Sequence, residues 1–394
     1  QISAFMQLIM NREHYFILAG ETSADLLGAS LMRSMQKISP SSIKWIGIGG
    51  EQMQKQGLIS NLPISELSVI GTLDALISYQ RLLRVAKLQI AQILKVRPKV
   101  VFTVDTKQFS LKFAMLLRKE MDKANWHVPI IQLVAPTIWA WGRWRAKKFE
   151  QNFDAILCLF PFEPAYFEST KTKAIYVGHP EAGRVPELKK IRINVGNKIP
   201  PVVGLFPGSR DKEIDYNLLD MLEAARIFNI NFPQYRFLLP TTSGLEKEVR
   251  KQIESYDLDI EVVVGINAFK NALSQISAAL CVSGTATLQL ALNAVPAVTC
   301  YKTSFLNFWI MRFLVKVKDP ILPNILLGRT LYPCHLQSKQ TPIALSSSLQ
   351  QICEKMPDYQ KTMIAEAERL GKLLLADGKD FETVLAKSLK QFIN

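Results

Sequence analysis

The sequence predicts an α/β protein with two doubly wound, Rossmann-like domains that face a cleft. The first observation is length: 394 residues exceed what one hydrophobic core usually organises, so two domains are expected. The second is that short apolar runs alternate with longer amphipathic ones, which is typical of βαβ units and a parallel sheet covered by helices. The third is that this alternation pauses once, near the middle of the chain, and then resumes.

The first half of the chain contains the apolar runs that define an N-terminal domain over residues 1–178. The predicted strands are Tyr15–Ala19, Lys44–Ile48, Lys99–Val104, Ile130–Val134, Ala155–Phe160 and Ala174–Val177. Stretches between them, such as Leu26–Gln36 and Leu73–Lys95, are predicted helices because their apolar residues recur at helical spacing.

A stretch rich in Pro, Gly and Lys, residues 179–200, is predicted to be a linker. A C-terminal domain follows over residues 201–355, with strands predicted at Val202–Phe206, Arg236–Leu239, Ile260–Val264, Ala278–Val282 and Ala297–Tyr301. Residues 356–394 have a helical pattern and are expected to pack back on the N-terminal domain. Because ligands of such sheets bind at the carboxyl ends of strands, both domains are expected to present loops to the cleft.

The charge balance points to an anionic partner. Lys and Arg number 48 against 34 Asp and Glu, a formal charge of +14. Nucleic acid, acidic lipid and phosphorylated substrates would all satisfy this surplus, but the sequence contains no nucleic-acid recognition motif. The five cysteines form no CxxC pair and the four histidines are scattered, so we predict free thiols in a reducing compartment, no metal site and no other cofactor.

The sequence favours a cytoplasmic protein that is peripheral to a membrane. Its start lacks the charge order of a secretory signal, and no apolar run approaches the ~18 residues of a spanning helix. Two stretches, Val69–Leu83 and Phe305–Lys318, combine apolar residues with Arg and Lys. Such helices lie in a bilayer interface, although a core helix is the alternative for either one. Because the chain begins with Gln, the sequence leaves open whether it belongs to a longer polypeptide.

Two loops of the second domain have the features of a diphosphate site. Pro207-Gly208-Ser209-Arg210 follows a predicted strand, with a glycine that permits close approach and an arginine where a helix N-terminus favours an anion. Its serine, or Asp211, could cap that helix. Ser283-Gly284-Thr285 follows another strand, and Gln289 lies one turn further, on the face that could meet a ribose. One such loop is an ordinary turn, but two in one domain predict a nucleotide diphosphate.

The first domain offers acidic and aromatic groups instead. The loop Gly20-Glu21-Thr22-Ser23-Ala24-Asp25 is not a dinucleotide fingerprint and suits hydroxyl groups better than phosphates. Asp105 ends a predicted strand, where catalytic groups lie in such sheets; a helix N-cap is the alternative. Trp139, Trp141 and Arg145 belong to a stretch of interleaved aromatic and basic residues, which suits a sugar, a lipid headgroup, a membrane interface or stacked bases.

These motifs together resemble the lipid-A-disaccharide synthase family, from about Tyr15 onward. The matching segments, in the order of the family, are GETSADLLGA (20–29), GIGGEQMQKQG (47–57), ISELSVIG (64–71), Asp105, P-x-x-WAW (136–141), LFPFE (159–163), YVGHP (176–180), LFPGSR-x-x-E (205–213), SGTATL (283–288) and LPNILLGR (322–329). The resemblance implies a GT-B fold, an acceptor-binding and membrane-side N-terminal domain, a UDP-sugar-binding C-terminal domain, and a place on the inner face of the inner membrane.

The resemblance also implies an inverting glycosyltransferase that condenses UDP-2,3-diacylglucosamine with 2,3-diacylglucosamine 1-phosphate, giving lipid A disaccharide 1-phosphate and UDP. Asp105, or alternatively Glu21, would take the proton from the acceptor hydroxyl. Arg210 and the 283–285 loop would stabilise the departing UDP. The candidate substrate-binding residues are Gly208, Ser209, Ser283, Gly284, Thr285, Gln289, Asn324, Gln337, Trp139, Trp141 and Arg145.

Three segments depart from the family pattern. Where the family has Asp-x-Pro-Asp-Phe-Asn, this chain has Asp105-Thr106-Lys107-Gln108-Phe109-Ser110. Gln289 replaces a glutamate, and Cys334 stands where the family tends to have another. These departures keep two alternatives open: a catalytically weak relative that binds UDP and lipid, or a different UDP-sugar-dependent enzyme of the same fold. The sequence also leaves open the oligomeric state, a homodimer included.

Overall fold

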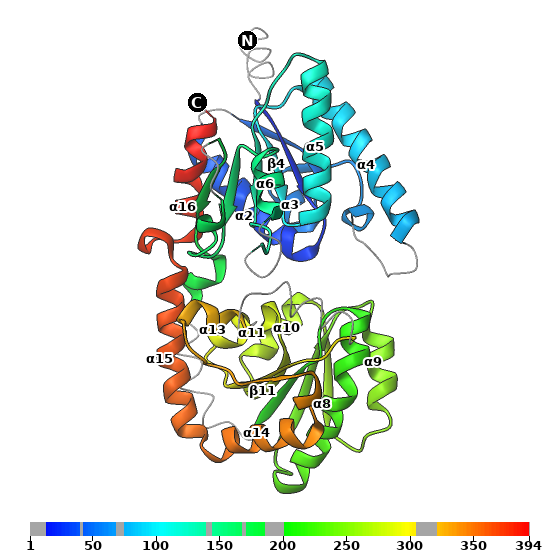
Figure 1. Ribbon diagram of the computed structural model, residues 1–394, viewed down its shortest axis with the longest axis vertical. Helices are drawn as coiled ribbons and strands as arrows, with labels where there is room; N and C mark the ends of the chain where they lie inside the picture. Colours follow the sequence, from blue (N-terminus) through cyan, green and yellow to red (C-terminus); the bar gives the residue numbers. More distant parts are fainter. Residues whose placement is uncertain are drawn as a thin grey trace, which may run out of the picture. The chain divides into compact units, whose positions relative to one another are not determined.

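A computed structural model of the protein describes residues 13–39, 42–67, 75–138, 144–167, 171–185, 201–304 and 321–393. The chain divides into two compact units (Figure 1). The first consists of Gln1–Pro180 together with Leu374–Asn394, and the second of Glu181–Leu373. Each unit is built on its own parallel sheet, which confirms the predicted fold class of two doubly wound α/β domains.

The first unit contains a seven-stranded sheet in the order β3-β2-β1-β4-β5-β6-β7. The strands are β1 (Glu13–Ala19), β2 (Ile43–Ile48), β3 (Leu58–Ser60), β4 (Val101–Val104), β5 (Ile130–Leu133), β6 (Ala155–Cys158) and β7 (Lys173–Tyr176). All but β3 overlap a predicted strand; β3 was missed because three residues form no recognisable apolar run. The strand order reverses between β1 and β4, and such a reversal places ligand-binding loops at the carboxyl ends of those two strands.

Helices bury both faces of this sheet. They are α2 (Thr22–Ile38), α3 (Glu51–Lys55), α4 (Ala75–Val96), α5 (Lys107–Lys123), α6 (Trp144–Glu150) and α16 (Phe381–Leu389). Side chains of α2, α3 and α16 share one apolar cluster with Tyr15 and Ile17 of β1. Side chains of α4, α5 and α6 share another with Phe16 and Leu18. Successive residues of β1 therefore point to opposite cores, as in any strand buried on both sides.

The second unit contains a six-stranded sheet in the order β10-β9-β8-β11-β12-β13. The strands are β8 (Val202–Phe206), β9 (Arg236–Thr241), β10 (Ile260–Val264), β11 (Ile276–Val282), β12 (Ala297–Tyr301) and β13 (Cys334–Leu336). The helices are α8 (Asp211–Asn231), α9 (Glu246–Ile253), α10 (Ile266–Leu273), α11 (Thr285–Leu292), α13 (Leu322–Leu327), α14 (Pro342–Glu354) and α15 (Met356–Leu374). Only β13, again of three residues, had no predicted counterpart. The order reverses between β8 and β11.

Short 3₁₀ turns complete the described elements: Ile64–Leu67, Pro164–Tyr166, Pro180–Arg184, Gln337–Lys339, Ala376–Gly378 and Lys390–Phe392. The chain re-enters the first unit at Leu374, later than residue 356, because contacts within the second unit hold α15. Glu366 of α15 pairs with Arg329, and a side chain at Gly371 would lie 2.9 Å from a methyl group of Val185. The segment after α15 then packs α16 along α2.

Candidate functional site

The two carboxylates predicted for catalysis come from neighbouring loops of the first unit. Ala19 and Val104, the last residues of β1 and β4, lie opposite each other in the sheet. The loops that begin at Gly20 and Asp105 are therefore adjacent, at the reversal of strand order. They touch so closely that a Cβ on Gly20 would lie 2.4 Å from the Thr106 methyl carbon, which is why the position requires glycine. Glu21 follows this glycine and is exposed.

Asp105 has a left-handed backbone that its surroundings fix firmly. Its φ is +52° and that of Thr106 is +36°, and Thr106, not Asp105, is the N-cap of α5. The Asp105 N–H donates to the Leu133 carbonyl at 2.9 Å, and the Ser110 hydroxyl donates to the Asp105 carbonyl at 3.1 Å. The carboxylate stays accessible: the side chain is 28% exposed, with Oδ1 3.6 Å from Nζ of Lys107. The main chain is held, and the carboxylate, beside Lys107, stays partly exposed to solvent.

The second acidic residue of the first loop has a structural role. Asp25 is buried and its carboxylate accepts backbone N–H bonds from Gly50 at 2.8 Å, Gln52 at 2.9 Å and Met53 at 3.1 Å. These groups belong to the first turn of α3, whose free N–H groups need acceptors. Of the two carboxylates in the loop, Glu21 is therefore the one that faces solvent.

The two predicted phosphate loops are neighbours in the second unit. Phe206 of β8 lies opposite Cys281 of β11, so the loops that follow these strands lie side by side where the strand order reverses. They lead into α8 and α11, whose N-caps are Arg210 and Gly284 and neither of which has a side-chain cap. Around Gly284 the space is open: the nearest atom that a Cβ would meet is 4.0 Å away. Two adjacent, uncapped helix N-termini form a place that favours an anion.

Glu213 organises the first of these loops, a role that the sequence reasoning missed. The Ser209 N–H donates to Oε2 of Glu213 at 2.8 Å, and Arg210 donates to Oε1 at 3.3 Å. Gly208 has a φ of +117°, and a Cβ there would lie 2.4 Å from that of Glu213. Neither Ser209 nor Asp211 caps the helix; Glu213, in its first turn, instead accepts from the loop that precedes it. The acidic residue three positions into the helix is the signal that could have identified it.

Arg210 itself extends into solvent, with 82% of its side chain exposed. The end of β12 borders the same loop. The pKa of Tyr301 is raised above its ordinary value mainly because the ring is buried and then by the charge of Glu213, while the Arg210 charge acts to lower it. The guanidinium is thus an exposed positive charge beside the N-terminus of α8, paired with the Glu213 carboxylate.

Comparison with known proteins identifies the family. A family described as Lipid-A-disaccharide synthetase matches residues 15–388. The chain belongs to this family. A lipid-A-disaccharide synthase of Rhodopseudomonas palustris is 32% identical over 356 residues, covering 89% of this chain and 88% of that protein. One of Pseudomonas putida is 34% identical over 337 residues, covering 84% and 88%. The protein is therefore a glycosyltransferase of lipid A biosynthesis.

Solved structures show that the fold is of the GT-B type. MurG of Acinetobacter baumannii superposes with a TM-score of 0.53 at 12% identity, covering 97% of this chain and 99% of that one. A UDP-GlcNAc 2-epimerase of Neisseria meningitidis, solved bound to UDP-GlcNAc, gives a TM-score of 0.63 at 10% identity, covering 96% and 100%. At these identities the likeness concerns the fold alone.

Two further residues of the family motifs support loops of the second unit. Asn324 is buried; its Oδ1 accepts the N–H groups of Leu331 at 2.8 Å and Tyr332 at 3.0 Å. The amide of Gln337 pairs with both backbone groups of Thr303, accepting at 2.9 Å and donating at 3.0 Å. Both amides are engaged with main chain, and their contact with substrate stays a prediction. Gln289 lies half-buried on α11.

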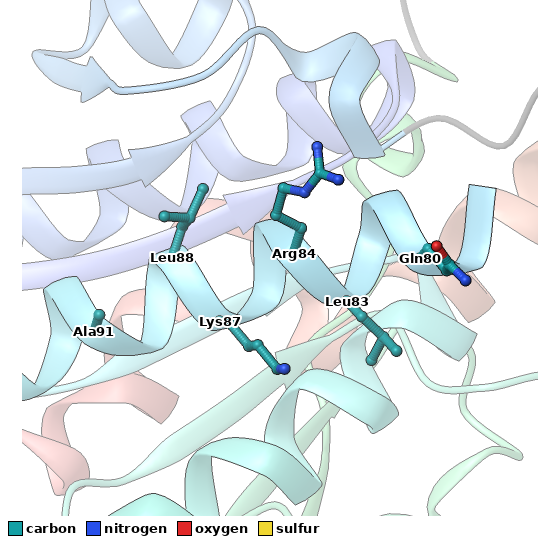
Figure 2. A pocket seen from close by; sticks show the side chains of 6 residues that line it. All are labelled: Gln80, Leu83, Arg84, Lys87, Leu88 and Ala91. Carbon is teal, nitrogen blue, oxygen red and sulfur yellow. The ribbon is translucent and has the colours of Figure 1, made fainter. Parts of the chain in front are cut away.

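Several predicted contacts with lipid lie outside the described residues. Trp139, Trp141 and the stretch Phe305–Lys318 are among them, as is the beginning of Val69–Leu83; Arg145 is half-buried on α6. The described part of α4 presents a groove lined by Gln80, Leu83, Arg84, Lys87, Leu88 and Ala91 (Figure 2). Leu88 is 55% exposed among these cationic neighbours. Within the described residues, no helix combines the length and apolar character needed to cross a bilayer.

Proposed function

We propose that the protein condenses UDP-2,3-diacylglucosamine with 2,3-diacylglucosamine 1-phosphate, forming lipid A disaccharide 1-phosphate and UDP. Membership of the family supports the reaction. The observation that carries the assignment of the site is the pair of adjacent, uncapped helix N-termini beside the exposed Arg210. Such a pair suits a diphosphate, which needs several N–H donors and a positive charge within a short distance.

In this proposal the diphosphate of the donor binds to the loops 207–210 and 283–285, with Gln289 near the ribose. When the bond between the anomeric carbon and the diphosphate oxygen breaks, negative charge grows on that oxygen. N–H groups that already point at this place stabilise the charge without rearranging, and the Arg210 guanidinium adds to their effect. UDP leaves with both electrons of the broken bond.

The acceptor supplies its 6-hydroxyl as nucleophile. Asp105 accepts the hydroxyl proton while the oxygen attacks the anomeric carbon from the side opposite UDP, which inverts that carbon and gives a β-1,6 linkage. Glu21, exposed on the neighbouring loop, is the alternative base. Because both substrates carry acyl chains, we further propose that the enzyme works on the cytoplasmic face of the inner membrane, with the cationic groove of α4 toward anionic lipid.

The test is turnover by the purified protein with both lipid substrates, with the disaccharide identified by mass spectrometry and UDP measured in parallel. Asp105→Ala and Arg210→Ala run beside the wild type. We expect a disaccharide phosphate and one UDP per condensation from the wild type, and strongly reduced product from each variant. A folded wild-type protein that forms no disaccharide would refute the proposal.

A weak, diverged enzyme is the second candidate, and one observation favours it. Lys107 lies 3.6 Å from the Asp105 carboxylate, at a position where the family has proline, and an ammonium group there competes with the acceptor hydroxyl for that carboxylate. Replacing Gln108 by Asp and Gln289 by Glu restores the acidic residues of the family. A large gain in turnover would support decay of the activity, whereas unchanged turnover would support an enzyme adapted to its own residues.

A further inference from the structure

A polar pair interrupts the apolar centre of the first unit. Thr103 of β4 and Gln132 of β5 lie opposite each other in the sheet, and both are fully buried. Their neighbours on the same face, Val101 and Ile130, belong to the apolar cluster under α4 and α5. Burying an amide there is unfavourable unless its groups are hydrogen-bonded. The hydrogen-bond partners of the Gln132 amide therefore indicate the role of this residue.

The Gln132 amide is fully engaged at the end of its strand. The Thr103 hydroxyl donates to Oε1 at 2.6 Å, which fixes the orientation of the amide and turns Nε2 toward the loops. Nε2 lies 2.9 Å from the carbonyl oxygen of Asp105, 3.0 Å from that of Leu133 and 3.2 Å from that of Val134. One buried side chain therefore ties together the main chains that follow β4 and β5.

These main chains are strained where the amide holds them. The φ angles of Asp105, Thr106 and Val134 are +52°, +36° and +78°, all in the left-handed region. For a β-branched residue such as Val134 this conformation is rare. Such a conformation is unfavourable by itself and persists only where the surroundings hold it. Nε2 of Gln132 contacts the carbonyls of two of the three.

We propose that Gln132 is a positioning residue for Asp105: it holds the strained loop and thereby sets the direction of the carboxylate. It acts through the main chain and does not meet the substrate. This inference rests on the proposed role of Asp105 as the base. Without the amide, the loop relaxes toward ordinary φ values and the carboxylate moves away from the acceptor hydroxyl. A displacement of about 1 Å at a reacting group costs on the order of 10²-fold in rate.

The primary variant is Gln132→Leu, which keeps much of the volume and removes the hydrogen bonds. We expect kcat to fall roughly 10- to 100-fold while the KM for the UDP-sugar changes little, because the donor site lies on other loops. Gln89→Leu is the matched control. Gln89 of α4 is also a buried glutamine of this unit, but its amide pairs with the side chain of Asn61. We expect that variant to lose stability without losing kcat.

A double-mutant cycle with Asp105→Ala separates positioning from general damage. If Gln132 acts through Asp105, then Gln132→Leu lowers the residual turnover of Asp105→Ala no further. An equal further drop in that background would overturn the inference. Full turnover by Asp105→Ala would instead refute the proposal that Asp105 is the base, and Gln132 would then have no base to position. Full turnover by Gln132→Leu beside an impaired Asp105→Ala would refute the positioning role alone.

Thr103→Val keeps the test decisive if Gln132→Leu does not fold. This change removes only the hydroxyl that orients the amide, and valine fits a buried strand. We expect kcat to fall by about 3- to 10-fold, which is less than in Gln132→Leu. The KM for the UDP-sugar is again expected to change little. An unchanged kcat in folded Thr103→Val would contradict the proposed link between the amide and the carboxylate.

Discussion

The loop that carries Asp105 and the loop that carries Arg210 each follow a strand beside the reversal of strand order in its own sheet, yet they are built differently. The Asp105 main chain is held from beneath by buried groups, including the amide of Gln132. The Arg210 side chain is 82% exposed, and the loop is tied by Glu213 at the surface. The first loop fixes the main chain of a short side chain, Asp105, and the second lets the long side chain of Arg210 extend into solvent.

This difference matches what each group is proposed to do. A general base works only when its oxygen lies within hydrogen-bond distance of the proton that it takes, so its direction must be fixed. A diphosphate presents several equivalent oxygens, and a guanidinium can bind them through several donors. An arginine that binds a diphosphate can therefore vary in side-chain direction, whereas a general base cannot.

The largest expected effect comes from removing the fixed base while keeping its shape. We expect Asp105→Asn to lower kcat by roughly 10²- to 10⁴-fold, the usual contribution of a positioned base. UDP affinity, measured by isothermal titration calorimetry, is expected to stay within about twofold of the wild type, because UDP binds to other loops. A comparable loss of UDP affinity would contradict the division of labour between the loops.

Removing the exposed Arg210 side chain is expected to weaken UDP binding and also to slow the departure of UDP. Arg210→Ala loses a charge that contacts the diphosphate before and during its departure, so we expect weaker UDP binding and a fall in kcat/KM on the order of 10²-fold. The matched control is Arg226→Ala, further along the same helix, where the arginine also pairs with a glutamate three residues away. We expect that control to bind UDP normally; equal losses in both variants would point to general charge instead.

The tether of the free arginine is expected to matter less. Glu213→Ala deprives the Ser209 N–H of its acceptor and loosens the loop, so we expect UDP affinity to fall about tenfold, in line with the loss of one charge-assisted hydrogen bond. Glu213→Gln keeps an acceptor and is expected to lie between that variant and the wild type. Tighter UDP binding by either variant would instead show that the Glu213 carboxylate competes with the diphosphate for Arg210.

Much of the fold could be predicted because most of its strands are buried on both faces and are therefore continuous apolar runs. The strands β3 and β13 could not, since each has only three residues and is defined by its pairing with a neighbouring strand. The loops 207–210 and 283–285 were predicted as a pair from composition, and sheet register shows that they adjoin. This site could be predicted because the glycine, serine and arginine that indicate it lie within single loops of the sequence.

Gln132 and Glu213 were not predicted as site residues, for a different reason. Each acts on the main chain of another segment, and which segment it meets depends on register and on where a helix begins. A glutamine within the apolar run IIQLV, and an acidic residue in the first turn after PGSR, were the available signs. The sequence shows a polar residue inside a buried strand, but only the pairing of the strands shows which main-chain groups that residue bonds.

The smallest expected effect concerns a second carboxylate that pairs with arginine, far in sequence from both loops. Glu382 of α16 accepts from Arg33 at 2.7 Å and from Lys37 at 2.8 Å on α2. Burial alone would raise the pKa of Glu382, but the hydrogen bonds and charges of Lys37 and Arg33 outweigh it and hold the pKa below its ordinary value. A carboxyl group with a lowered pKa in the folded state stabilises the protein at neutral pH.

Glu382→Gln is therefore expected to lower the free energy of unfolding by about 0.5 kcal/mol at pH 7, a value kept small because the ion pairs are partly exposed to solvent. The difference from wild type is expected to persist down to about pH 4.3, the ordinary pKa of glutamate, and to shrink as the pH falls through the lower folded value. Urea unfolding at several pH values measures it. Turnover at pH 7 is expected to stay unchanged, because Arg33 and Glu382 join two helices, whereas Arg210 and Glu213 border the proposed ligand. A loss of turnover in Glu382→Gln would contradict this purely structural role of the ion pairs between α2 and α16.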